Sequence, residues 1–142
     1  MDGLVIDVDT APLLAALDRL ASEVVLRHTK AAALVTANRI QAEARARVAR
    51  RTGLTAQGIT VYPTRDGQGY VVMPFNDALE RERIAAGYDQ TAENLPIWLE
   101  FGTKFMAPQP YFFASAKLEE NAHDRRMRQA IQDAIDEVGL GE

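Results

Sequence analysis

The residue of this chain best suited to chemistry is Glu100, a carboxylate between two apolar residues with Lys104 four positions further on. Apolar surroundings raise the pKa of a carboxyl group, which can then act as a general acid or base. A nuclease built on Glu100 and Lys104 with Asp89 or Glu93 would need more acids close in sequence than the chain offers. We therefore expect a structural Glu100 that accepts hydrogen bonds from backbone amides of the following loop, or pairs with an arginine of a neighbouring subunit.

The other reactive side chains lack the spacing of known sites. The only histidines, His28 and His123, fall on separate predicted helices and form no metal-ligand pattern. Ser22 and Ser115 have no Gly-x-Ser-x-Gly environment, and the Gly-Gln-Gly run at 67–69 lacks the third glycine and the helix of a phosphate cradle. The chain has no cysteine, which excludes disulfides and a thiol nucleophile. We expect no catalytic residues, no cofactor and no metal, and hence a protein that is not an enzyme.

Composition points to a soluble globular protein. The chain has 142 residues, of which 47% are hydrophobic and 25% charged, which suits a single domain over residues 1–142. No run approaches the roughly 18 apolar residues of a membrane span. Acids stand near the start where a secretory signal would carry lysine or arginine, so we expect synthesis in a cytoplasm. The net charge of -4 argues against a general nucleic-acid binder.

Charge is nevertheless unevenly distributed. Five arginines lie between Arg39 and Arg51 against one acid, whereas residues 119–142 hold seven acids and three arginines. Arginines at the C-terminal end of a helix complement its dipole, which is the simplest interpretation. The alternatives are contacts with acids of a neighbouring subunit or with DNA, and the candidate residues for both are Arg45, Arg47, Arg50 and Arg51.

A long helix dominates the predicted elements. Residues 4–8 alternate as a short strand does, and apolar residues then recur at helical spacing from Leu13 to Val35. No proline or glycine interrupts the segment between Pro12 and Gly53, so a helix of about 40 residues would be about 60 Å long. That length exceeds the diameter of the globule, so part of the helix should project, bend or pack on other subunits. Two helices with a kink near 36–38 are the alternative.

The rest of the chain predicts a small sheet and a second helix. Residues 59–62 and 70–73 read as a hairpin joined by a glycine-containing turn. We expect a short helix from residue 76 or 77 to 86 within a flexible excursion at 77–96, and a short strand or helical turn at 95–101. Pro110 should start an amphipathic last helix, with a possible break near Asn121. The fold class is α+β, with a small antiparallel sheet packed against the long N-terminal helix and the C-terminal helix.

The segment from Ile97 to Leu118 is the most distinctive of the chain. It reads IWLEFGTKFMAPQPYFFASAKL, an apolar run, a Gly-Thr turn, a proline-containing loop and a new helix start. This order resembles the signature of the HK97 gp10-like tail-component proteins of tailed bacteriophages and prophages. The chain departs from that signature at Gln109, where the family usually has arginine, and at Tyr111, which is inserted before Phe112. The matching residues are Leu99, Glu100, Phe101, Gly102, Thr103, Met106, Pro108, Pro110, Phe112, Ala114 and Ala116.

The resemblance implies a noncatalytic virion protein at the head-to-tail junction or the top of the tail, assembled in the host cytoplasm. Such proteins form a homo-oligomeric ring, commonly a hexamer, that joins the tail to the head and lets DNA pass. The implied partners are other copies of the chain, neighbouring tail-tube, terminator or head-closure proteins, and DNA in the lumen through nonspecific contacts; no membrane is implied. The expected subunit or partner interface comprises Trp98, Glu100, Phe101, Gly102, Thr103, Phe105, Met106, Pro108, Pro110 and Phe112. The alternative is a small cytoplasmic adaptor that binds a partner through the amphipathic C-terminal helix.

Overall fold

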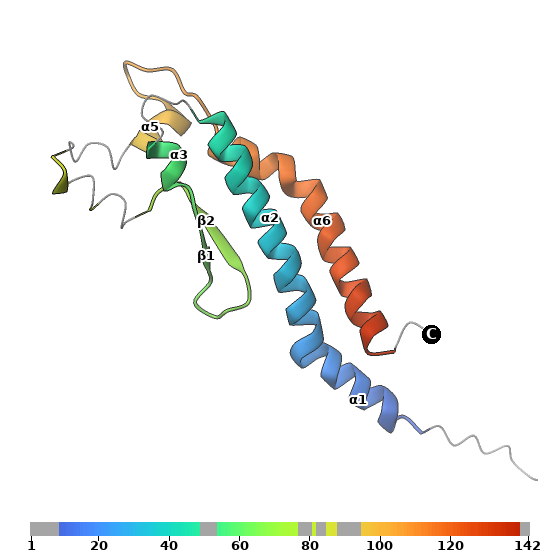
Figure 1. The fold of residues 1–142 in the computed structure, drawn as a ribbon. Coiled ribbons are helices and arrows are strands. Elements are labelled where there is room, and N and C mark those ends of the chain that lie inside the picture. The colour runs from blue at the N-terminus through green and yellow to red at the C-terminus, as the bar shows by residue number, and fades with distance from the viewer. Residues whose placement is uncertain (1–8, 49–53, 77–80, 82–84, 88–94, 140–142) are drawn as a thin grey trace, which may run out of the picture.

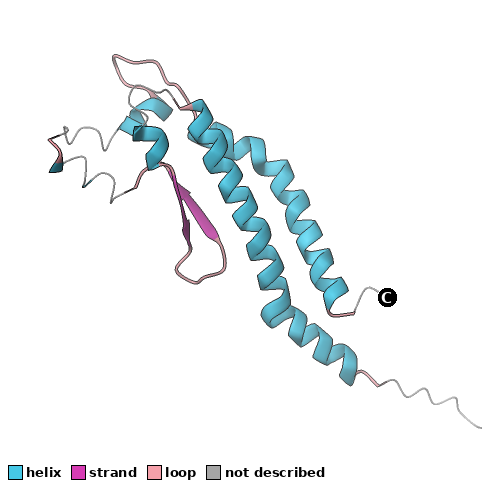
Figure 2. Ribbon diagram, viewed as in Figure 1, coloured by secondary structure: helices cyan, strands magenta, loops and turns pink. Residues whose placement is uncertain are grey.

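The computed structural model describes residues 9–48, 54–76, 81, 85–87 and 95–139. It is an α+β structure, as predicted, in which two long helices carry a small hairpin and a cluster of short helices at one end (Figures 1 and 2). The elements in chain order are α1 (Ala11–Arg19), the π-helical turn η1 (Leu20–Val24), α2 (Val25–Arg47), α3 (Leu54–Gly58), β1 (Thr60–Pro63), β2 (Tyr70–Met73), α5 (Leu95–Phe101) and α6 (Phe112–Glu137).

The predicted long helix forms, and it bends at a position that the sequence did not mark. Helical backbone runs without a gap from Ala11 to Arg47, but the turn at Leu20–Val24 is π-helical. The amide of Val25 donates to the carbonyl of Leu20, five residues back, and such a bulge redirects a helix. Figure 1 shows α1 leaving the line of α2 at this turn. The expected alternative of a kink near 36–38 is wrong, because residues 36–38 lie inside α2.

The helix also ends earlier than the first glycine after it. Val48 has an extended ψ of 137°, which stops the helical hydrogen bonding. Residues 49–53, which include Arg50 and Arg51, lie outside the described part of the chain. The predicted strand at 4–8 lies outside it as well.

Helix α6 lies antiparallel beside α2 along most of its length (Figure 1). Small residues line the contact, with Ala37 and Ala44 of α2 and Ala130 and Ala134 of α6 all buried. Small side chains let two helix backbones approach closely, and the alanines also favour helix formation. The possible break near Asn121 is wrong, since α6 is continuous from Phe112 to Glu137.

The hairpin forms where the sequence predicted it. Strands β1 and β2 are antiparallel, with Thr60 opposite Met73 and Pro63 opposite Tyr70. Thr64 closes the loop, because its hydroxyl donates to Asp66 and accepts from the amide of Gly69. The hairpin packs on the side of α2 away from α6 (Figure 2).

The core is small and lies at one end of the helix pair. There the C-terminal end of α2, α3, the start of β1, α5 and the start of α6 meet. Its buried members are Ala44, Val48, Ala56, Ile59, Leu99 and Tyr111. Among the described residues, ten apolar residues are buried while fifteen large apolar side chains are exposed. This balance is unusual for a protein that works as a monomer.

The remaining expectations for the second half of the chain can be compared with these elements. The segment at 95–101 is the helix α5 and not a strand, whereas most of the expected helix at 76–86 and of the excursion at 77–96 lies outside the described residues. Pro110 does not start α6; the helix begins at Phe112 with Tyr111 as its N-cap residue. No described helix is both long enough and apolar enough to cross a membrane.

Candidate functional site

Glu100 is a cap for the N-terminus of α6. Its Oε2 accepts from the backbone amides of Tyr111 and Phe112, both at 2.9 Å, and its Oε1 accepts from the amide of Phe113 at 3.0 Å. The first amides of a helix have no partner within the helix, and the helix dipole favours a negative charge beside them. Tyr111 at the N-cap position makes no side-chain cap of its own. The carboxylate of Glu100 in α5 therefore supplies the N-terminal cap that the residues at the start of α6 do not provide.

This cap uses both carboxylate oxygens inside the chain. Glu100 is only 8% exposed, and charge-assisted hydrogen bonds of this kind are stronger than neutral ones. The geometry matches the first structural role expected for Glu100, acceptance of backbone hydrogen bonds, and no arginine of a neighbour is needed to satisfy it.

Gly102 makes the connection between α5 and α6 possible. Its φ of 76° lies in the left-handed region, and a Cβ built there would stand 2.8 Å from the carbonyl oxygen of Met106 and 2.8 Å from the nitrogen of Pro108. Both features require glycine. The chain then turns tightly, with Thr103 and Met106 exchanging backbone hydrogen bonds, and the amide of Gln109 returns to the carbonyl of Leu99 at 2.7 Å.

Tyr111 anchors the start of α6 in the core. It is 1% exposed, and its hydroxyl is a buried side-chain polar atom without a hydrogen-bond partner among the described residues. Burial raises the pKa of Tyr111 to about 12, and the negative charge of Glu100 acts in the same direction. Leaving a buried hydroxyl unpaired costs free energy, so the ring and not the hydroxyl accounts for the contribution of Tyr111 to packing.

The same loop and helices display aromatic side chains to the outside. We call the exposed side chains of this end the aromatic face. The largest exposed fraction belongs to Phe105, at 92%, on the tip of the turn, and Phe101 and Phe113 pack against each other with ring centroids 6.0 Å apart. The members of the aromatic face are Ile97, Trp98, Phe101, Phe105 and Phe113.

An apolar cleft opens beside the aromatic face. It has a volume of about 230 Å³ and lies between the end of β2, α5 and the start of α6. Drug-sized ligands occupy pockets of about 300–1,000 Å³, so this cleft suits one or two side chains of a protein partner better than a small molecule. Residues that line it are Val72, Met73, Pro74, Pro96, Ile97, Glu100, Phe101, Tyr111, Phe112 and Phe113.

The structure distributes the predicted interface residues over three environments. Trp98, Phe101, Thr103, Phe105, Pro108 and Pro110 are exposed; Gly102, Met106 and Phe112 are half-buried; Glu100 is buried. All ten nevertheless lie on one segment, from α5 to the start of α6. The buried and half-buried members shape the loop, and the exposed members face outward.

Of the predicted arginine cluster, the structure describes Arg45 and Arg47, and their environments differ. Arg45 is half-buried and donates to the carbonyls of Ala56 at 3.0 Å and Ile59 at 2.9 Å, where Gln41 also donates. Arg45 thus ties α2 to the segment before β1. Arg47 is exposed and lies 3.6 Å from Glu43 on the same helix.

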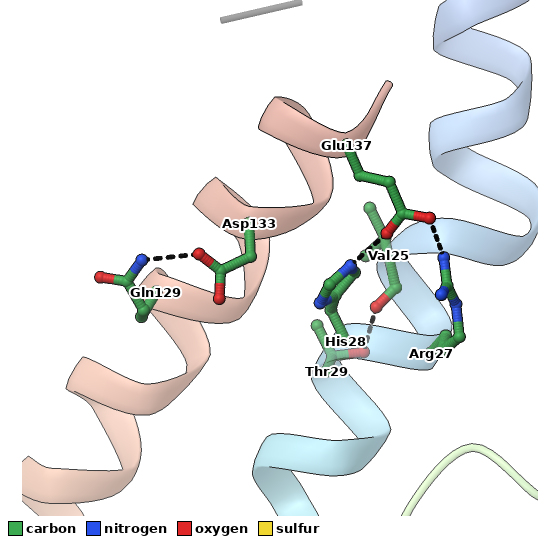
Figure 3. A network of polar contacts seen from close by, with 7 residues as sticks. All are labelled: Val25, Arg27, His28, Thr29, Gln129, Asp133 and Glu137. Carbon is green, nitrogen blue, oxygen red and sulfur yellow. Dashed lines mark hydrogen bonds and ion pairs between the residues drawn. The ribbon is translucent and has the colours of Figure 1, made fainter. Parts of the chain in front are cut away.

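Both histidines lie in polar networks between α2 and α6. Glu137, near the end of α6, accepts from Arg27 and lies 2.6 Å from Nε2 of His28 (Figure 3). Hydrogen bonds from Arg27 first, and then from His28, hold the pKa of Glu137 below its usual value. The second network joins Thr36 to His123 at 2.8 Å.

The second network is more buried than the first. Thr36 is 8% exposed and accepts from Arg126 at 3.0 Å, and Arg126 in turn donates to Glu119 at 2.9 Å. These contacts fix the alignment of α6 along α2. Within the described ranges no group of three or more potential ligands could hold a metal ion.

Helix α1 exposes a surface that the sequence did not identify residue by residue. None of its residues is buried, and Leu13, Leu14 and Leu17 are exposed. The sequence predicted only that part of the long helix would project, bend or pack on other subunits, because its length exceeded what one globule can cover. Ile97 and Phe113 were also absent from the expected interface, although the first is 55% and the second 59% exposed.

Comparison with protein-family models, with characterised proteins and with solved structures finds no match for this chain.

Proposed function

We propose that the protein is a structural subunit of a tailed bacteriophage or prophage virion. In this proposal it forms a ring at the head-tail junction or at the top of the tail, joins the tail to the head and leaves a passage for DNA. The observation that carries the proposal is the aromatic face, presented on a loop whose shape depends on Glu100 and Gly102. The assignment to a phage rests in addition on the resemblance of residues 97–118 to the tail-component family.

The aromatic face has the properties of an assembly surface. Exposed apolar patches of this kind mark interaction sites, and aromatic and methionine side chains are enriched where binding energy concentrates. The cap by Glu100 keeps α5 and α6 in a fixed relation, so the face exists before any partner binds. A preformed surface loses less conformational entropy on association than a flexible one.

Two exposed arginines on α2 also fit a subunit of a ring. Arg47 stays exposed near the end of α2, and Arg39 is exposed about two turns of helix earlier on α2. In a ring these residues would face DNA in the lumen or acids of a neighbouring subunit. Contacts with passing DNA would be to phosphates and would weaken with salt.

The adaptor alternative is less well supported. It requires a free apolar stripe on the C-terminal helix, but α6 uses its stripe within the chain. Ala130 and Ala134 are buried against α2, and Glu137 is paired with Arg27 and His28. Ile131, 44% exposed, is left on the outer side of α6.

The decisive test is electron microscopy of lysates from the encoding phage or prophage with this gene silenced. DNA-filled heads beside unattached tails, with joined particles restored by the supplied protein, would support a joining or completion role. Complementation with Phe101→Asp should fail, whereas Leu118→Asp, a change at another exposed apolar residue, should restore joined particles. Normal infectious particles in the absence of the protein would refute the proposal.

A further inference from the structure

We draw no further inference here: the strongest candidate, the apolar cleft between the end of β2, α5 and the start of α6, which the exposed rings of Phe101 and Phe113 help to line, carries none, because nothing in the described part of the structure shows what covers it.

Discussion

Replacing Glu100 with glutamine tests the cap on which the candidate site depends. Glutamine has almost the same shape, but it keeps one acceptor oxygen and replaces the other with an NH₂ donor. The remaining oxygen can serve the amides of Tyr111 and Phe112, which share Oε2 in the wild type. The amide of Phe113, which bonds to Oε1, would then face a donor.

The expected loss of stability follows from these contacts. A backbone donor left without a partner away from water costs about 1–3 kcal/mol. Removal of the negative charge from the helix N-terminus costs about 0.3–1 kcal/mol more. Together the change should lower the free energy of unfolding by about 1.3–4 kcal/mol, which for a chain of this size lowers the Tm by about 4–12 °C.

Thermal unfolding by circular dichroism measures the effect, at one protein concentration for all variants because association also stabilises the folded state. Glu120→Gln is the control, since Glu120 is exposed on α6 and lies outside the cap. Hydrogen exchange adds a local readout. The amide of Phe113 should exchange faster in Glu100→Gln than in the wild type, and at the wild-type rate in Glu120→Gln. A Tm within about 1 °C of the control, with unchanged exchange at Phe113, would show that the carboxylate does not hold α6.

Three further predictions concern the loop, the helix pair and the core. Gly102→Ala should lower the urea midpoint of unfolding by the equivalent of about 1–3 kcal/mol, because alanine disfavours a positive φ and its Cβ would collide with the loop backbone; an unchanged midpoint would contradict the loop geometry. Glu137→Gln should melt below the wild type at pH 7, and the difference in Tm should narrow as the pH falls below the ordinary glutamate range. Arg27 and His28 lower the pKa of Glu137 in the folded state, so its stabilisation is present above the unfolded pKa and is lost as pH falls through the folded one. If the difference in Tm between Glu137→Gln and the wild type does not narrow in acid, the stabilising contact of Glu137 with Arg27 and His28 is refuted. Tyr111→Phe should be neutral or stabilising, and absorbance titration of the variant should lose an ionisation at about 12. Because tyrosine in the unfolded chain ionises at about 10, the wild type should lose stability relative to this variant above that pH.

Local patterns in the sequence were sufficient for several elements. The hairpin was predicted within one residue of its strands, because alternating β-branched and aromatic residues flank a glycine-containing turn. Helical spacing predicted the two long helices for a similar reason. These signals are local, since the residues that produce them are neighbours in the chain.

Boundaries and bends were less predictable. The helix bends at Leu20–Val24 and not at 36–38, and α6 passes Asn121 without a break. A π-helical turn shifts one hydrogen bond and leaves no composition signal comparable to proline or glycine. The early end of α2 at Arg47 likewise depends on packing, because Val48 turns into the core at 4% exposure.

The sequence by itself determined the fold class, the absence of cysteine chemistry and the position of the distinctive segment at 97–118. It also predicted a structural Glu100 that accepts hydrogen bonds from backbone amides of the following loop. Only the tertiary structure decided what Glu100 binds, since its three amide partners lie eleven to thirteen residues away and become neighbours when α5 meets α6. The same holds for the leucines of α1: spacing shows that a helix has an apolar side, but only the structure shows that Leu13, Leu14 and Leu17 are exposed.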